Sequence, residues 1–219
     1  PGVVAAKAAL DEIRMSGQLG RLLAARVYGS SKSYAVPVPP HFRPSESRHE
    51  RYPVWPTYPD WLDERYRPTY PWFLNSGSHD VSLLRHLLPG RMSVVGATSP
   101  NDGAVSALLR LADVPVHLEI AKTETGHWLE GAEFLFETGR LVLSVPSPMA
   151  TTEVAHVSID DFRRGLLGEV VKTDAGWSFA RQARSFVDAI VAGSATLASG
   201  EAGLGDMELT EAIWRNIQG

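Results

Sequence analysis

Apolar positions recur along the chain with two periods, which predict helices at both ends and strands between them. Residues 1–20 carry apolar side chains at roughly helical spacing, and glycines at 17 and 20 supply a stop, so we expect an opening helix. Residues 20–29 are rich in apolar residues that strands tolerate, and they predict a first strand. Further strands are expected at 91–99, 104–112, 114–123, 127–138 and 140–147. Short connections imply that these strands pair antiparallel, with a hairpin turn at Thr138-Gly139.

Two helices are predicted after the last of these strands. Residues 177–193 hold an amphipathic stripe at spacings of four, three and four: Phe179, Ala183, Phe186 and Ile190. A loop of small residues should follow at 194–205, and Asp206 is expected to N-cap a final helix with Leu209 and Ile213 on one face. The order of elements predicts an α+β fold, an open, predominantly antiparallel β-sheet with helices on one face. We expect one domain over residues 1–219.

Residues 37–72 interrupt the periodic pattern. They contain nine prolines, a density that prevents a long helix or a central strand. They also carry seven tyrosines and tryptophans, whereas disordered linkers are poor in aromatic residues. We interpret the segment as an ordered loop over a cleft or a subunit interface. A surface excursion that is merely pinned by its aromatic side chains fits the same pattern.

Composition and charge narrow the classes of partner. The net charge is -4 and the isoelectric point is near 6.0, so no overall basic field favours nucleic acid or anionic lipid. The longest apolar runs fall far short of the roughly 20 residues that span a bilayer, and no signal-like segment opens the chain. We therefore predict no membrane partner and a cytoplasmic location. The absence of cysteine excludes disulfides and thiolate metal sites.

The stretch NSGSHDVSLLRHLLPG, residues 75–90, holds the main candidates for chemistry. Ser78 is expected to N-cap a helix from about His79 to Leu88, with Asp80 in its first turn. Val81, Leu84 and Leu88 should form its core face. An imidazole at the positive end of the helix dipole resists protonation, and a general base must begin neutral. His79 is thus a candidate base, which Asn75 would assist from the turn, or simply a helix-start residue satisfied by backbone or water.

Other catalytic motifs are missing. His86 follows His79 by seven residues, not the four of a helical H-E-x-x-H pair, and we expect no metal site. The sequence around Ser78 lacks the second glycine of G-x-S-x-G. GLGDME, residues 203–208, lacks the third glycine of a dinucleotide fingerprint and is interpreted as a helix cap. The chain therefore carries no recognisable nucleotide site of its own.

Three segments together resemble the C-terminal domain of the Gfo/Idh/MocA family of NAD(P)-dependent oxidoreductases. PGVVAAKAALDEIRMSGQLGRLLAARV resembles the family's junction, where a helix ending in a G-x-x-G turn leads into the first strand of the sheet. NSGSHDVSLLRHLLPG resembles its histidine motif, and GWSFARQARSFVDAIVAG with AGLGDMELTEAIW resembles its last two helices. The family's N-terminal Rossmann domain is absent, and we expect it to precede Pro1, since the chain does not begin with methionine.

The resemblance implies a glyceraldehyde-3-phosphate-dehydrogenase-like domain that binds substrate and forms a homodimer or homotetramer through its open sheet face. It implies hydride transfer between NAD or NADP, held mainly by the missing domain, and a hydroxyl-bearing carbon of a sugar, cyclitol or nucleotide-sugar. His79 matches the family's proton-transfer histidine, assisted by a lysine of the missing domain. Asn75 stands where many family dehydrogenases carry aspartate, and Asp80, Tyr70 and Trp72 are expected to line the substrate site.

The resemblance leaves two functions open. The fragment alone should not turn over substrate, because it lacks the cofactor cradle. A retained module that binds carbohydrate or dimerises without catalysis is the alternative, and Asn75 keeps it open, since an amide cannot take a proton.

Overall fold

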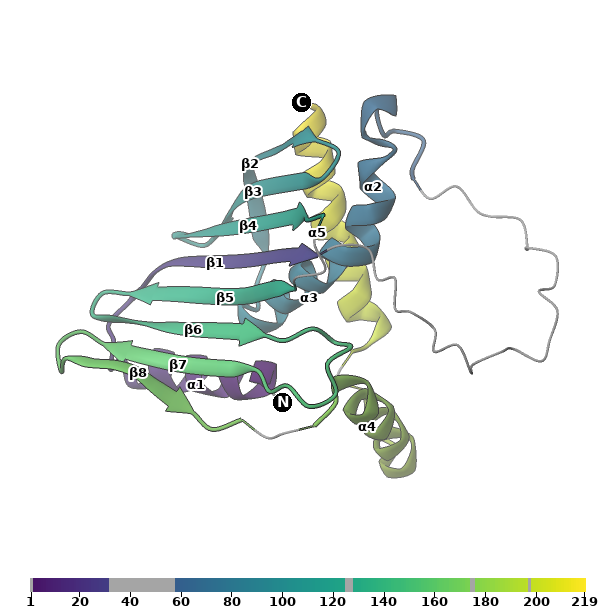
Figure 1. The fold of residues 1–219 in the computed structure, drawn as a ribbon. Helices are drawn as coiled ribbons and strands as arrows, with labels where there is room; N and C mark the ends of the chain where they lie inside the picture. Colours follow the sequence, from purple (N-terminus) through teal and green to yellow (C-terminus); the bar gives the residue numbers. More distant parts are fainter. Residues whose placement is uncertain (1, 32–57, 125–127, 174–175, 197) are drawn as a thin grey trace.

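An eight-stranded sheet organises the molecule, in the order β2-β3-β4-β1-β5-β6-β7-β8 (Figure 1). The computed structural model describes residues 2–31, 58–124, 128–173, 176–196 and 198–219. The strands are β1 Leu22–Ser31, β2 Met92–Asn101, β3 Ala104–Leu111, β4 Val114–Lys122, β5 Leu129–Phe136, β6 Gly139–Val145, β7 His156–Asp161 and β8 Leu166–Val171. Within the described ranges, β1 and β4 pair parallel and the other neighbours pair antiparallel. The predicted α+β class and its open, predominantly antiparallel sheet are confirmed.

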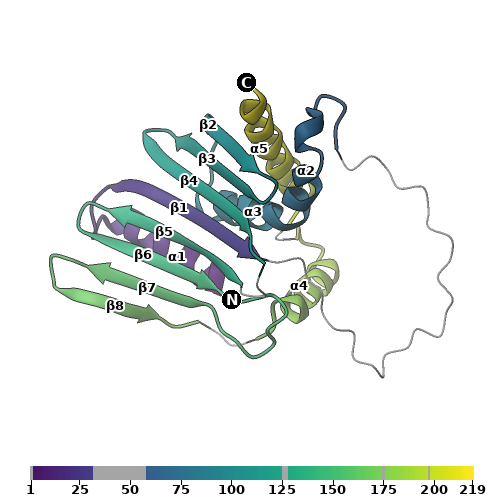
Figure 2. The ribbon, with the colours of Figure 1, turned by 45° about the horizontal axis from the view of Figure 1, so that its top comes forward.

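One face of this sheet is covered by helices (Figure 2). The helical segments are α1 Gly2–Ser16, a short 3₁₀ turn Glu64–Tyr66, α2 Thr69–Trp72, a π-helix Phe73–Gly77, α3 Ser78–Leu87, α4 Ser178–Ala192 and α5 Gly200–Gln218. Helix α1 packs against β6 and β7, α3 against β1 and β4, and α5 against β2. These three helices share the covered face, as the sequence predicts.

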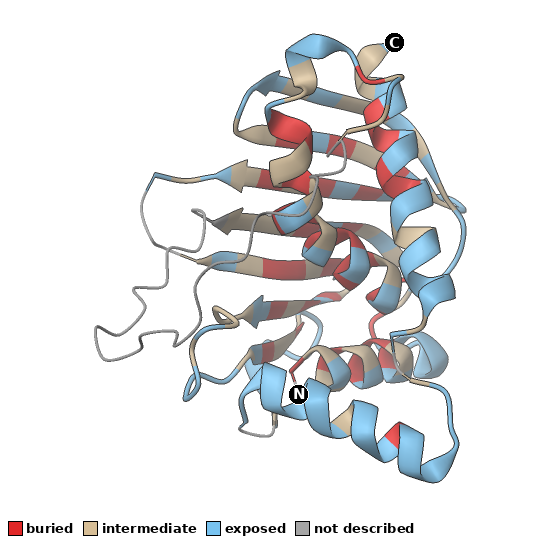
Figure 3. Cartoon of the chain, turned by 90° about the vertical axis from the view of Figure 1, so that its right-hand side faces the viewer, coloured by how far each residue is buried: buried red, intermediate tan, exposed pale blue. Residues whose placement is uncertain are grey.

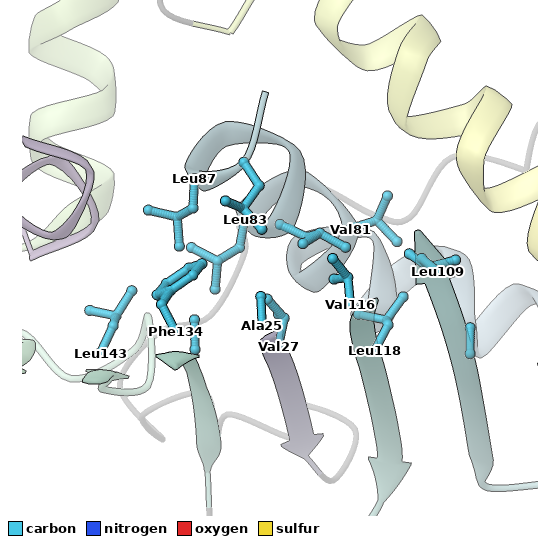
Figure 4. Packing of buried hydrophobic residues seen from close by; sticks show 14 of the residues in the cluster. Ala25, Val27, Val81, Leu83, Leu87, Leu109, Val116, Leu118, Phe134 and Leu143 are labelled. Carbon is cyan, nitrogen blue, oxygen red and sulfur yellow. The ribbon is translucent and has the colours of Figure 1, made fainter. Parts of the chain in front are cut away.

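The core lies between that face and the helices. Alternate residues of each central strand point inward, and on β4 these are Val116, Leu118 and Ile120, all buried. Helix α3 lays Val81 and Leu83 over the central strands (Figure 4). Burying a large apolar side chain contributes about 1.5–3 kcal/mol, so this layer accounts for the position of α3 over the sheet. The core face predicted for Val81, Leu84 and Leu88 is confirmed.

The opposite face of the sheet carries charged pairs across neighbouring strands. Arg26 on β1 donates to Glu119 on β4 over 2.7 Å. On β6, Arg140 donates to Asp160 on β7 over 2.6 Å and to Glu133 on β5 over 2.9 Å. No described helix covers this face, so these cross-strand charged pairs are open to solvent.

Strands β7 and β8 are additional to those predicted from the sequence. Both are six residues long, and the residues of β8 are mostly exposed. An edge strand without a buried face lacks the alternation of apolar and polar residues by which a strand is recognised. Its neighbour β7 buries only Val157 and Asp160 fully, which leaves a similarly weak pattern.

Helix α5 begins earlier than predicted. Its first residue is Gly200, and the hydroxyl of Ser199 caps it by accepting from the backbone N–H of Ala202 over 3.2 Å. Asp206 is therefore not the N-cap; it lies inside the helix and forms an ion pair with Arg85 of α3. A Cβ at Gly205 would come 2.6 Å from the Arg85 guanidinium carbon. The glycine thus admits the Arg85 side chain between the two helices, and the GLGDME string is helix rather than a cap.

The apolar stripe of α4 is confirmed as an amphipathic helix, but the described residues leave it uncovered. Phe179, Phe186 and Ile190 are 45%, 57% and 64% exposed. Figure 3 shows almost the whole of this helix, at the bottom of the view, as exposed surface. Gly193, with φ of 61°, ends the helix as predicted.

The predicted loop 37–72 lies partly outside the described residues, since 32–57 are not among them. Its boundary was wrong at the other end, because helix α2 begins at Thr69. Pro68 and Pro71 fall at the start of this helix, where proline is tolerated because the first N–H groups have no helical partner. Tyr66 packs its ring 5.8 Å from Trp214 of α5, so aromatic contacts fix this part of the segment to the last helix.

Candidate functional site

His79 lies within a continuous helical run rather than at a helix start. Helix α2, the π-helix and α3 follow one another without a break from Thr69 to Leu87. Ser78 has helical angles, φ −59° and ψ −31°, and its backbone N–H donates to the Phe73 carbonyl. The predicted N-cap at Ser78 is therefore wrong, because the helical run starts at Thr69, nine residues upstream. His79 therefore does not lie at the positive end of a helix dipole.

The π-helix determines which residues of this run face the core. It widens one turn by a residue, and such insertions are frequent at functional sites. Ser76 and Gly77 are buried there, whereas Asn75 and His79 are exposed. A Cβ at Gly77 would come 2.9 Å from the Cδ1 atom of Ile120, so the glycine permits the close approach of the helix to β4.

A cleft of about 520 Å³ opens beside His79. His79, Trp128 and Glu130 line it together. The rest of its lining comes from the first turns of α1 and α4, the end of β6 and the segment that follows β6. These further lining residues include Gly2, Val3, Val145, Ser147, Glu153, Ser178, Phe179 and Gln182. An imidazole, a carboxyl group and an indole ring on one wall can donate to, accept from and pack against a polyhydroxylated ligand.

A smaller cavity lies beneath the same three residues and reaches Asp80. The Asp80 side chain is 4% exposed, and its Oδ1 atom has no hydrogen-bond partner among the described residues. Burial, and secondly the negative charge of Glu130, raise the pKa of Asp80 to about 8. Burial also raises the pKa of Glu130 to about 7, against the opposing effect of the Trp128 indole N–H, which donates to Glu130 Oε2 over 3.1 Å. Two protonatable carboxyl groups therefore lie beside the imidazole.

The structure brings together only part of the predicted site. Asp80 and His79 line the small cavity, whereas Asn75, four residues before His79, lines neither that cavity nor the cleft. Tyr70 is buried, with its ring 5.3 Å from that of Trp214, and packs in the core. Trp72 is also packed against the core. These contacts give Tyr70 and Trp72 a structural role in the described chain.

Glu130 and Trp128 were not identified from the sequence. The sequence pattern of β5 could have indicated Glu130. Apolar residues at every second position of that strand, Ala132, Phe134 and Phe136, are buried. Glu130 is in phase with them, so a carboxyl group falls at an inward position. Such a position is costly for a charge and marks a functional candidate.

The described residues contain no group of three or more His, Asp or Glu side chains that could hold a metal ion. Nor does any described helix combine the length and apolarity that crossing a bilayer requires.

No family model matches the sequence, and no curated protein is significantly similar to it. Solved structures, however, share the fold. The 3-ketoreductase KijD10 from Actinomadura kijaniata, in complex with NADP and TDP-benzene, matches with a TM-score of 0.65 and 17% identity over 95% of this chain and 58% of its own. An aldose-aldose oxidoreductase from Caulobacter crescentus, complexed with glycerol, matches with a TM-score of 0.62 and 12% identity over 98% of this chain and 58% of its own. The chain has the C-terminal domain fold of Gfo/Idh/MocA-type oxidoreductases.

This Gfo/Idh/MocA-type fold agrees with the resemblance found in the sequence. The chain spans just over half the length of these solved structures. At such low identity the match establishes the fold, and the chemistry has to be argued from the site.

Proposed function

We propose that the chain is the substrate-binding domain of an NAD(P)-dependent oxidoreductase. The substrate would be a sugar, cyclitol or nucleotide-sugar, with hydride transferred to or from a hydroxyl-bearing carbon. The observation that carries the proposal is the cleft of about 520 Å³ with His79 in its wall, on a fold shared with sugar-related oxidoreductases. Its volume suits a ligand of monosaccharide size or larger.

His79 would move the hydroxyl proton in this reaction. When a carbinol is oxidised, its carbon loses hydrogen with both bonding electrons, and its oxygen loses a proton. The nicotinamide, when bound, supplies the acceptor for the hydride. His79, exposed at the cleft, supplies the group that takes the proton or returns it in the reverse direction.

Most of the cofactor would have to be held by chain outside these 219 residues. The sequence offers no glycine-rich loop that opens a helix for a pyrophosphate. The exposed apolar face of α4 adjoins the cleft through Phe179, and the start of α1 at Gly2 lies in the same wall. An uncovered apolar face beside a substrate cleft supports the docking of that cofactor-holding part of the protein there. The isolated chain is therefore expected to be inactive.

The alternative function is a module that binds carbohydrate or dimerises without catalysis. The observation that favours it is Asn75, whose amide cannot supply the charge of a carboxylate beside His79. In either case the open sheet face is the proposed surface for a homodimer or homotetramer.

The test is a comparison of two proteins, the 219-residue chain and the gene product expressed from the natural start of its reading frame. Each is mixed with NADH or NADPH and a panel of keto-sugars and nucleotide-sugars. The proposal expects oxidation of the reduced nicotinamide by the longer product alone. Saturation-transfer NMR on the 219-residue chain should show the substrate bound without turnover. Sugar binding without turnover by either protein would favour the module.

A further inference from the structure

Asp80 approaches the sheet because Gly29 has no side chain. A Cβ at Gly29 would fall 2.6 Å from the Asp80 carboxyl carbon, so the carboxyl group occupies the place of that missing side chain. Gly29 is on the inward face of β1, in phase with the buried Ala25 and Val27. Asp80 thus brings its carboxyl group down from α3 onto the covered face of the sheet.

Glu130 is the neighbour of that position across the strands. It pairs with Gly29 in the register of β1 and β5, and directly opposite residues place their Cβ atoms about 4.5–5.5 Å apart. Since the Asp80 carboxyl group fills the Gly29 side-chain position, it lies next to the start of the Glu130 side chain, and the charge of Glu130 acts on it. Both line the small cavity, which has room for about one water molecule at roughly 10 Å³.

Positive charge is scarce around this pair. The small cavity is lined by β1, the π-helix and α3, β4, and the start of β5, through Gly29, Ser30, Ser76, His79, Ile120, Ala121, Trp128 and Leu129. Among these described lining residues, His79 is the one other ionisable side chain. A buried and a half-buried carboxylate without a fixed cation cannot both stay ionised at low cost.

We propose that Asp80 and Glu130 share one proton at neutral pH and act as a proton store for His79, with Glu130 as the member that opens into the cleft. Asp80 is 4% exposed, and its buried Oδ1 atom, which has no hydrogen-bond partner among the described residues, is where a shared proton or a bridging water would satisfy the pair. The role as a proton store for His79 rests on the proposed function, whereas the sharing of one proton between the two carboxyl groups does not.

The proton balance of the step is simple. In the oxidation direction, the hydroxyl proton passes to His79, and the imidazolium then passes a proton to the Glu130 carboxylate. The pair changes from one proton to two and later releases one to solvent through the cleft. In the reduction direction, the shared proton moves to His79 and onward to the carbonyl oxygen whose carbon has received the hydride. The pair then regains one proton from solvent through the cleft. Glu130 is a positioning and relay residue here, since it acts through His79.

A ¹³C NMR titration of the side-chain carboxyls in the 219-residue chain tests the shared proton. Signals are assigned by comparison of the parent with the E130Q and D80N variants. E130Q should lower the pKa of the Asp80 carboxyl by at least about one pH unit, because it removes a like charge from the pair. If E130Q weakens folding, the reciprocal measurement is the titration of the Glu130 carboxyl signal in the D80N variant, where the pKa of Glu130 should fall for the same reason.

The matched control is E133Q, which removes a carboxyl group from the same strand on the opposite face of the sheet. It should leave the Asp80 titration as in the parent. Two carboxyl groups that titrate independently below about pH 5, or an Asp80 curve that E130Q does not move, would overturn the shared proton.

The store has a separate readout in the pH profile of turnover by the gene product from its natural start. E130Q should displace an ionisation limb of the kcat profile, and an unchanged profile would overturn the store. If the titration shows a shared proton but the gene product turns over no substrate, the proposed function and the store are contradicted and the shared proton is supported. The two failures are therefore distinguishable.

Discussion

The Asp80 carboxyl group occupies the space that a side chain at Gly29 would fill. This contact joins α3 to β1 and sets a carboxyl group in the small cavity that His79 also lines. It explains why β1, otherwise rich in side chains that pack, carries a glycine at an inward position. The same contact makes Gly29 the residue whose substitution should disturb the site most directly.

Gly29→Ala should lower the free energy of unfolding by roughly 1–3 kcal/mol, because the methyl group would overlap the buried carboxyl group. Urea unfolding measures the change. Gly96→Ala is the matched control, since a Cβ at this strand glycine meets nothing within 4 Å. In a D80A background the cost of Gly29→Ala should shrink. An equal cost in both backgrounds would show that Asp80 is not what the methyl group meets.

Stability should fall as the pH rises through the range where the buried pair ionises. In the unfolded chain both carboxyl groups lose their protons near pH 4, whereas in the folded chain they keep them up to about 7 for Glu130 and about 8 for Asp80. The folded state binds more protons over that interval, so this contribution is complete below about pH 4 and is lost by about pH 8. The slope should be at most about 1.4 kcal/mol per pH unit for each carboxyl group.

Urea unfolding at a series of pH values checks this slope against D80N and E130Q. Each variant lacks one of the two ionisations, so its stability should depend less steeply on pH than that of the parent. Parallel curves for the parent and both variants would contradict the raised pKa values.

Polar substitutions on the open face of α4 should leave the fold intact. Phe186→Gln and Ile190→Gln remove apolar side chains that are 57% and 64% exposed, so the free energy of unfolding should change by less than about 0.5 kcal/mol. Non-specific aggregation of the isolated chain through this apolar face, measured by light scattering, should decrease, whereas association through the open sheet face should not change. Ile213→Gln on α5 is the contrasting variant, because Ile213 is fully buried and the change should cost at least about 2 kcal/mol. A large loss of stability in the α4 variants would mean that the helix face is covered.

Elements with strong periodicity were predicted well from the sequence. The opening helix, five of the later strands and the core face of α3 all depend on local alternation of apolar and polar residues. The start of the long helix at Thr69 was missed because proline reads as a helix breaker, although it is tolerated in a first turn. The start of α5 was missed because the glycines at 203 and 205 suggest a loop, whereas Gly205 makes room for Arg85.

The candidate site was only half predictable. His79 and Asp80 are adjacent in the sequence, so a local motif finds both. Glu130 joins them only because β1 lies between β4 and β5, with Gly29 opposite Glu130. That strand order is a property of the tertiary fold, and no periodicity within a single segment contains it.

The central claim is that His79 transfers the substrate proton, and its most direct test is the kcat of nicotinamide-dependent turnover in a histidine-substituted enzyme. The measurement compares His79→Ala with His86→Ala in the gene product from its natural start. His86 is the matched control, an exposed histidine of the same helix that lines neither cavity. The account predicts that His79→Ala lowers kcat by roughly 10²-fold or more, the scale of general acid–base catalysis, while His86→Ala leaves it unchanged. Equal kcat values for the parent and both variants would contradict it.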